Sequence, residues 1–384
     1  MTALPIARLF GFEIRLHVSW ALILALITVT VATQVEALAP NTSSLLRWTI
    51  GGVAAFVFLL SGLAHELGHA VAARRAGMPG GPVVVFFFGG AANPTLEART
   101  PRDEIVSALA GPVISLAIGA AFLLIAAAGG ALGNLVDGVQ LVIAEVAFFV
   151  GVMNVILGTV NLIPAFPLDG GRIARGIAWA RTGDPDAGLR FAGVTGRRVG
   201  LTLAMVGFLV VVFFAQEHAT DGLMLALCGW FLVSSGRTIE RMVDLDALLD
   251  GIRVADVMDH DIAGVPPGLT LDTFAGQLLD GSGGGSLAVL RGSDLLGMVG
   301  AAQVRRVRRD RWADTRVEDL MVSGEALPEV APDTTLRAAF DQLRRSGLDG
   351  LPVLDAGRLT GIVTRRAITE AIRARLQATA KVTP

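Results

Sequence analysis

Residues 50–70 read IGGVAAFVFLLSGLAHELGHA, an apolar run that ends in two histidines and a glutamate. With the residues on either side, the run is long enough to cross a lipid bilayer as an α-helix. His65 and His69 are four residues apart, so on a helix they project from one face, and Glu66 lies beside them. An ionisable group costs about 3 kcal/mol at the centre of a membrane helix and marks a functional site there. The segment therefore predicts a zinc site in which the histidines are ligands and Glu66 activates water.

Charged residues are unevenly distributed along the chain. Over 384 residues the hydrophobic content is 53% and the mean hydropathy is +0.61, which is too apolar for an ordinary soluble protein. Long apolar runs fill residues 1–240, whereas residues 250–384 mix acidic, basic and turn residues. We therefore expect a membrane domain over residues 1–245 and a soluble domain over residues 252–384.

The net charge and the cysteine count exclude two classes of function. A net charge of −2 gives no basic field, so we expect no nucleic-acid partner. Cys228 is the only cysteine, so the sequence offers neither a disulfide framework nor a thiolate zinc site.

Six apolar runs have the length of a membrane-spanning helix, which is about 17 to 25 residues. They predict a multi-pass α-helical domain in the lipid bilayer. The runs lie near residues 17–33, 48–72, 105–128, 139–163, 198–215 and 222–238.

Arginines favour one side of this predicted membrane domain. They precede the first run, lie between the second and third and between the fourth and fifth, and follow the sixth, whereas the alternate loops hold only Arg47. Because cytoplasmic loops are rich in arginine and lysine, we expect both termini in the cytoplasm. His65 and His69 then lie near the cytoplasmic end of the second run.

The segment Pro82–Gly90, sequence PVVVFFFGG, is apolar but too short to cross the bilayer. Its β-branched and aromatic residues favour extended structure, so we expect a re-entrant β-hairpin. Such a strand could pair with an extended peptide substrate. The alternative is a buried packing loop with no role toward a substrate.

A catalytic zinc site commonly has three protein ligands, so the two histidines need a third. Residues 161–172, sequence NLIPAFPLDGGR, end the fourth run with two prolines that stop a helix and two glycines that allow close backbone approach. Asp169 in this segment is at the depth inferred for His65 and His69. The alternative is that Asp169 caps the next helix.

The His-Glu-Leu-Gly-His pattern at 65–69, paired with Asn-x-x-Pro-x-x-Pro-Leu-Asp-Gly-Gly at 161–171, resembles the site-2 protease family of intramembrane zinc metalloproteases. Three shorter matches support the resemblance: Phe88-Gly89-Gly90, the His17-Val18-Ser19-Trp20 entry to the first run, and Ala110-Gly111-Pro112, which we expect to open the third run. The likeness covers nearly the whole chain.

This resemblance implies an endopeptidase that cleaves membrane-spanning segments. His65, His69 and Asp169 would bind one zinc ion per chain, and Glu66 would be the general base and later the general acid. The residues implied to hold the substrate or the developing oxyanion are Asn161, Gly89 and Gly90. The implied substrates are single-pass membrane proteins such as membrane-held regulators of transcription, unwound locally before cleavage.

The soluble half contains an internal repeat. Val254-Ala255-Asp256-Val257-Met258 recurs as Val317-Glu318-Asp319-Leu320-Met321, and Leu287-Ala288-Val289-Leu290 recurs as Leu351-Pro352-Val353-Leu354. Each copy alternates strand-like and helix-like runs, so two α/β modules are expected, at about 252–312 and 315–376.

The repeat resembles a tandem CBS pair, a module that binds adenine nucleotides in many proteins. Thr364 matches the family's hydroxyl after the last strand, but Ala367 stands where the family has an acid for ribose. The first copy has Gly300 and Gln303 at the equivalent places. We therefore favour a role for the CBS pair in homodimer formation or partner docking. Binding of an adenine nucleotide, with Thr364 as a contact, remains the alternative.

Two competing functions remain open from the residues. One is a metal or ion transporter gated by the CBS pair, with His and Asp as the transport site, although a transporter has no need of Glu66 beside the first histidine. The other is an inactive relative that binds membrane helices. Abundant Ala, Gly and Arg with a single lysine indicate a prokaryotic source.

Overall fold

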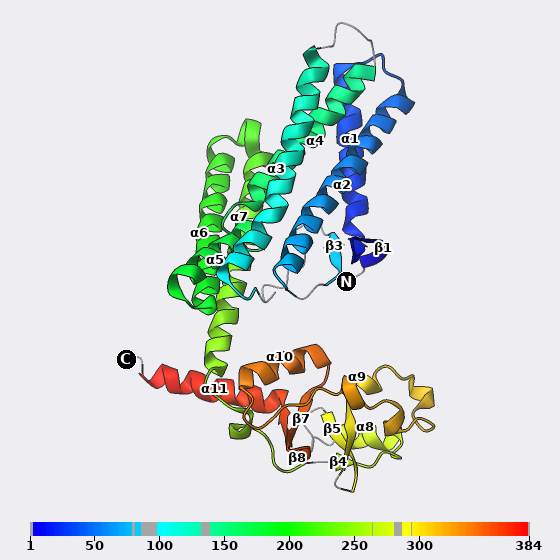
Figure 1. The fold of residues 1–384 in the computed structure, drawn as a ribbon, viewed down its shortest axis with the longest axis vertical. Helices are drawn as coiled ribbons and strands as arrows, with labels where there is room; N and C mark the ends of the chain where they lie inside the picture. The colour runs from blue at the N-terminus through cyan, green and yellow to red at the C-terminus, as the bar shows by residue number, and fades with distance from the viewer. Residues whose placement is uncertain are drawn as a thin grey trace. The chain divides into compact units, whose positions relative to one another are not determined.

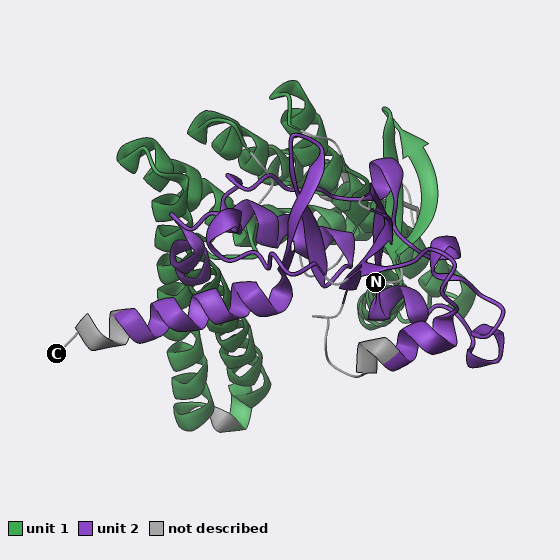
Figure 2. Ribbon diagram, turned by 90° about the horizontal axis from the view of Figure 1, so that it is seen from below, with its two compact units in different colours: residues 1–243 green, residues 244–384 purple. Residues whose placement is uncertain are grey.

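The chain is described by a computed structural model over residues 3–78, 81–85, 98–131, 139–262, 264–279, 286–292 and 294–382. It forms two compact units, Met1–Val243 and Asp244–Pro384 (Figure 2). The boundary between the units falls inside one long helix, α7 (Ala215–Leu249).

Six helices of the described residues are long and apolar enough to cross a membrane, which confirms the predicted multi-pass α-helical domain (Figure 1). α6 begins earlier than the apolar run at 198–215 because Asp184 caps it: the Asp184 carboxylate accepts a hydrogen bond from the Asp186 N–H at 2.8 Å, and Pro185 fills the first position. The six are α1 (Ser19–Leu38), α2 (Ser44–Arg75), α3 (Pro101–Ala131), α4 (Val139–Asn161), α6 (Pro185–Phe213) and α7.

The prediction that Ala110-Gly111-Pro112 opens the third helix is wrong. α3 begins at Pro101, where the Thr100 hydroxyl accepts a hydrogen bond from the Asp103 N–H at 3.2 Å. Acidic side chains in the first turn suit the positive end of the helix dipole. The tripeptide instead lies inside α3, which packs against α2.

A three-stranded sheet, which the sequence did not predict, lies beside α2. Its order is β1 (Ala3–Leu9), β2 (Phe12–His17) and β3 (Val83–Val85), with β1 antiparallel and β3 parallel to β2. β3 lies within the segment for which a re-entrant hairpin is predicted. Residues 86–97, including Gly89 and Gly90, are outside the described part of the chain, so the hairpin remains a prediction.

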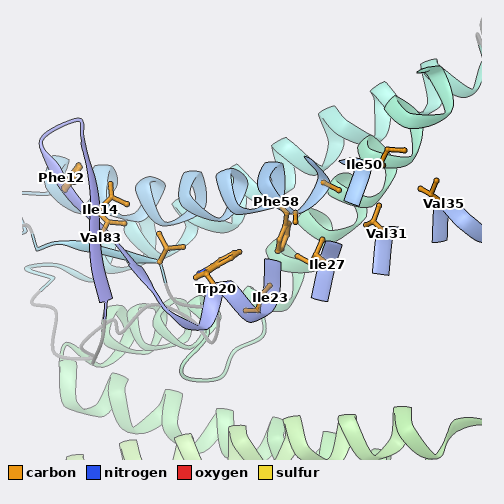
Figure 3. Packing of buried hydrophobic residues seen from close by; sticks show 13 residues of the cluster. Phe12, Ile14, Trp20, Ile23, Ile27, Val31, Val35, Ile50, Phe58 and Val83 are labelled. Atoms are coloured by element: carbon orange, nitrogen blue, oxygen red, sulfur yellow. The ribbon is translucent and has the colours of Figure 1, made fainter. Parts of the chain in front are cut away.

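One apolar cluster fixes the sheet against α1 and α2 (Figure 3). Phe12 and Ile14 of β2 and Val83 of β3 join Trp20 and Phe58, which lie on the two helices with ring centroids 6.3 Å apart. The cluster therefore sets the position of α2, the helix that carries His65 and His69.

The chain reverses sharply between α4 and α5 (Asp169–Thr182). A Cβ atom at Gly170 would overlap the Ile163 carbonyl oxygen, and one at Gly171 would lie 2.7 Å from the Phe166 nitrogen. This confirms that the two glycines allow close backbone approach. Leu168, not Asp169, is the N-cap residue, and Asp169 is the first residue of α5.

Three pairs of glycines hold α6 and α7 together in antiparallel register. A Cβ atom at Gly200 would lie 2.7 Å from the Gly229 carbonyl oxygen, and one at Gly222 would lie 2.7 Å from the Gly207 carbonyl oxygen. The third pair is Gly193 with Gly236. Small residues at such seams let membrane helices approach backbone to backbone.

The second unit contains two α/β copies that share a 3-10 turn, a helix and a two-stranded ladder. In each, a two-stranded antiparallel ladder carries an irregularity at the same place, between Val289 and Leu290 in one and between Val353 and Leu354 in the other. The first module holds η1 (Val254–Asp256), β4 (Gly264–Val265), α8 (Leu271–Leu279), β5 (Ser286–Arg291), β6 (Asp294–Gly300), α9 (Ala301–Val304) and η2 (Arg309–Arg311). The second holds η3 (Val317–Asp319), η4 (Gly324–Ala326), α10 (Leu336–Ser346), β7 (Gly350–Asp355), β8 (Arg358–Thr364) and α11 (Arg365–Val382).

The repeated pentapeptides form the same hydrogen-bonded turn in both copies. Asp256 accepts a hydrogen bond from the Arg253 N–H at 2.8 Å, and Asp319 accepts one from the Arg316 N–H at 3.0 Å. Each aspartate thereby closes the turn at the start of its sequence copy, although Val254 of η1 packs in the core of the second copy and Val317 of η3 in the core of the first. The sequence repeat is thus a repeat of local structure.

Substituting Gly200→Ala should lower the free energy of unfolding of the first unit by about 1–3 kcal/mol, because the added methyl group forces α6 and α7 apart. Gly52→Ala in α2 is the matched control, since a Cβ atom there meets no other atom within 4 Å. Denaturant titration of both variants in detergent measures the difference. Equal stability of the two variants would contradict the close packing of α6 on α7.

Candidate metal centre

The two histidines of α2 and the first residue of α5 converge on one point. His65 Nε2 and His69 Nε2 are 3.1 Å apart, and Asp169 Oδ2 lies 3.3 Å from the first and 3.2 Å from the second. Within the described residues, these three form the one cluster of His, Cys, Asp or Glu whose ligand atoms all lie within 4.8 Å of one another. The structure thus brings together the three residues that the sequence singled out from segments a hundred residues apart.

Hydrogen bonds to α3 hold both imidazole rings. His69 Nδ1 is 2.7 Å from the Ser107 carbonyl oxygen, which can only accept, so Nδ1 carries a hydrogen and, in the neutral ring, Nε2 presents a lone pair. His65 Nδ1 is 2.8 Å from Ser115 Oγ, which can accept in the same way. Metal-binding histidines are commonly oriented by a hydrogen bond from their other nitrogen.

The three converging atoms fit a zinc ion. Asp169 Oδ2 is buried and has no hydrogen-bond partner among the described residues. Three electron-pair donors that face one another without a hydrogen between them repel unless a cation lies at their centre. Two imidazole nitrogens and one carboxylate oxygen are a donor set of catalytic zinc sites, which keep a fourth position for water or substrate.

α3 meets the histidines with small residues on one face. Ser107, Gly111 and Ser115 are four residues apart, and Gly111 lies opposite both rings: a Cβ atom there would overlap His69 Nε2 and lie 2.7 Å from His65 Nε2. Glycine is therefore required at residue 111, because any side chain would enter the space between the ligands.

Glu66 is half-buried beside the ligands. It precedes His69 by three residues and so shares one side of α2 with it. Its carboxylate interacts electrostatically with His65, His69 and Asp169. A carboxylate at this place can accept a proton from a water molecule at the centre and return it to a leaving group.

Asn161 ends α4, and its amide nitrogen donates a hydrogen bond to the Leu157 carbonyl oxygen of the same helix at 2.9 Å. An amide has two N–H groups and two lone pairs, so this bond leaves capacity for a second partner. Asn154, seven residues earlier, is fully buried and bonds Ser61 of α2 at 3.0 Å. Asn154 is therefore a contact between helices.

The remaining residues singled out in the sequence lie elsewhere. Gly89 and Gly90 fall outside the described residues. Thr364 ends β8 in the second unit, where its hydroxyl accepts a hydrogen bond from the Ala367 N–H at 3.1 Å and so begins α11. This capping bond gives Thr364 a structural role that requires no nucleotide.

Sequence reasoning missed the residues around the ligands: Glu104, Ser107, Gly111, Ser115 and Arg172. Glu104 is 1% exposed and is bonded to Arg172 at 3.1 Å. A glutamate at the start of an apolar helix was a usable signal, but it was overlooked because the third helix was expected to begin at residue 105. Arg172 was counted only as evidence for membrane orientation.

Comparison with known proteins agrees with the geometry. Residues 53–206 match the model of peptidase family M50, and residues 317–374 match that of the CBS domain. Rip3 of Mycobacterium tuberculosis, named as a zinc metalloprotease, is 32% identical over 366 residues, covering 94% of this chain and 91% of Rip3. A Synechocystis protein named in the same way is 27% identical, covering 96% of this chain and 95% of its own length.

Among solved structures, the site-2 protease from Methanocaldococcus jannaschii is similar at 22% identity with a TM-score of 0.39, covering 62% of this chain and 96% of that protein. The relationship to Rip3 spans nearly the full length of both proteins, and the family model covers the helices that carry the converging histidines and aspartate. The chain therefore belongs to the site-2 protease family of zinc metalloproteases, peptidase family M50, as a multi-pass membrane member that carries a CBS domain in its C-terminal part.

Proposed function

We propose that this protein is an intramembrane endopeptidase in which His65, His69 and Asp169 bind one zinc ion and Glu66 transfers the proton. The observation that carries the proposal is the convergence of His65 Nε2, His69 Nε2 and Asp169 Oδ2 within 3.3 Å of one another. A zinc ion held there would polarise the scissile carbonyl and make water a nucleophile at neutral pH.

The protein side chains would divide the remaining work. Glu66 accepts the proton from the attacking water and then donates it to the nitrogen of the departing amine, a role worth about 100- to 10,000-fold in rate. Asn161, at the end of α4, offers its amide to the substrate backbone or to the developing oxyanion. The transporter alternative is the weaker one, because ion transport gives no role to a carboxylate next to the first histidine.

Substrates of this enzyme would be membrane-spanning segments, for example of single-pass proteins that hold transcription regulators at the membrane. A helix hides its carbonyls in its own hydrogen bonds, so it must unwind before hydrolysis. We propose that the unwound substrate pairs with the segment that begins with β3 (Val83–Val85) and contains, further along the sequence, Gly89 and Gly90. Strand addition would replace the hydrogen bonds that the substrate helix loses.

We further propose that both termini are cytoplasmic and that residues 252–384 form a tandem CBS pair that modulates access or partner choice. The asymmetric arginines support the orientation. The structural repeat over about 252–312 and 315–376 supports the pairing. α7 has a kink at His218 and then runs from the candidate span to Leu249, which is buried in the core of the second unit.

The zinc mechanism predicts different outcomes for two variants. His65→Ala should lose bound zinc, because it removes one of three ligands. Glu66→Gln should keep about one zinc per chain yet lose at least about 100-fold in cleavage rate, because an amide cannot accept the proton. Metal content is measured on purified protein, and cleavage on a single-pass membrane protein in lipid nanodiscs. Proteolysis by Glu66→Gln at the wild-type rate would rule out the mechanism.

Gly111→Ala should lower the cleavage rate by about 100-fold, since a methyl group between the imidazoles displaces them by a large fraction of an ångström. Gly52→Ala, in the same helix as the histidines, should leave cleavage unchanged. Cleavage and zinc content are measured together. Wild-type values for Gly111→Ala would show that α3 does not close on the ligands as described.

The orientation predicts opposite labelling of two exposed positions, Asn41 between α1 and α2 and Arg181 in the last turn of α5. After Cys228→Ser, a single cysteine introduced by Asn41→Cys should react with a membrane-impermeant maleimide added outside intact cells. One introduced by Arg181→Cys should react only after the cells are opened. The reverse pattern would invert the topology and place the zinc site at the outer side.

A further inference from the structure

A buried ion pair lies next to the metal ligands and has no role in the mechanism above. Glu104, in the first turn of α3, is 1% exposed, and its Oε1 accepts a hydrogen bond from Arg172 Nε at 3.1 Å. The Arg172 side chain is 11% exposed. Arg175 Nη1 is 3.9 Å from the same carboxylate oxygen. Two helices that carry parts of the site, α3 and α5, are thus joined by charge.

A second bond from the same guanidinium leads to a metal ligand. Arg172 Nη2 donates to Ser107 Oγ at 3.0 Å, and the Ser107 carbonyl oxygen accepts the hydrogen of His69 Nδ1 at 2.7 Å. Arg172 follows Asp169 by three residues on α5, so both side chains lie on one side of that helix. Arg172 therefore lies one helical turn from Asp169 and also bonds Ser107, the serine that orients His69.

We propose that Arg172, held by Glu104, is a positioning residue that sets the distance between Asp169 and His69 for metal binding. The inference rests on the proposed zinc site. Arginine suits this role because its planar fork fixes two acceptors at once, which a lysine ammonium does not. Stability alone is a weak explanation of the pair, because buried ion pairs are often no more stable than apolar side chains of similar volume.

Four variants separate positioning from plain structural support. Arg172→Met removes both bonds, whereas Arg172→Lys keeps the charge beside Glu104 but loses the fixed fork to Ser107. Glu104→Leu combined with Arg172→Met replaces the whole pair by apolar side chains. Arg197→Met is the matched control, because Arg197 bonds Glu240 between α6 and α7 at 2.8 Å, outside the metal centre.

Each full-length variant is purified in detergent and measured in three ways. Zinc affinity is obtained by competition with a chelator. The absorption spectrum of the cobalt-substituted protein reports ligand geometry. The unfolding temperature of the metal-free protein reports stability without the metal.

Arg172→Met and Arg172→Lys should weaken zinc binding by about 10- to 100-fold and change the cobalt spectrum, as is typical when a partner of a metal ligand is lost. The double substitution should restore the unfolding temperature of the metal-free protein, while zinc binding stays weak. Arg197→Met should match the wild type in affinity and spectrum.

Two results would overturn the proposal while leaving the zinc enzyme intact: wild-type affinity and spectrum in Arg172→Lys, or recovery of zinc affinity together with stability in the double variant. The second would show that the pair supports only the fold. If the wild type and Arg197→Met bind no zinc, the proposed function itself fails. Should Arg172→Met not fold, Arg172→Lys and the double variant still decide the question.

Discussion

Three lone pairs that face one another within an apolar helix bundle are the constraint on which the rest of the membrane unit depends. With neutral rings and no cation between them, His65 Nε2, His69 Nε2 and Asp169 Oδ2 would repel, so the fold must hold the elements that carry them close together. Different interactions fix α2, which carries the two histidines, and α5, which carries Asp169. The apolar cluster around Trp20 and Phe58 fixes α2, and close backbone approach at Gly170 fixes the start of α5.

α3 supplies no ligand and yet completes the site. Its small face places Ser107 against His69 and Ser115 against His65, with Gly111 between them, so the two pairs run in opposite directions along α2 and α3. The two histidines are four residues apart on α2 and the two serines are eight apart on α3, about one and two helical turns, so each set stays on one face of its helix. Larger side chains on this face would separate the helices and release both imidazoles.

The sequence predicted the chemistry of this site better than its surroundings. His65, Glu66, His69 and Asp169 could be identified because ionisable groups and helix-breaking residues are rare in apolar runs, and the six spans follow from length and hydropathy alone. The β1–β2 hairpin was missed because Phe10-Gly11 is not a common turn pair, although both residues have positive φ. Ala110-Gly111-Pro112 is a match to the family, but the role of Gly111 beside the ligands could not be predicted, since it depends on the histidines that approach it from α2.

The apolar setting also explains why each histidine needs a partner within the protein. In water, Nδ1 and Nε2 could exchange their hydrogen, and either nitrogen could be solvated. In a bundle with little water, an unsatisfied N–H costs several kcal/mol, so the acceptors on α3 hold the hydrogen at Nδ1. Ser107 presents a carbonyl oxygen that can only accept, and this fixes the tautomer of His69 before any metal arrives. The apolar bilayer raises the free energy of burying the polar ligands. It also favours the Nδ1–H tautomer of the histidines, which leaves Nε2 available to bind zinc.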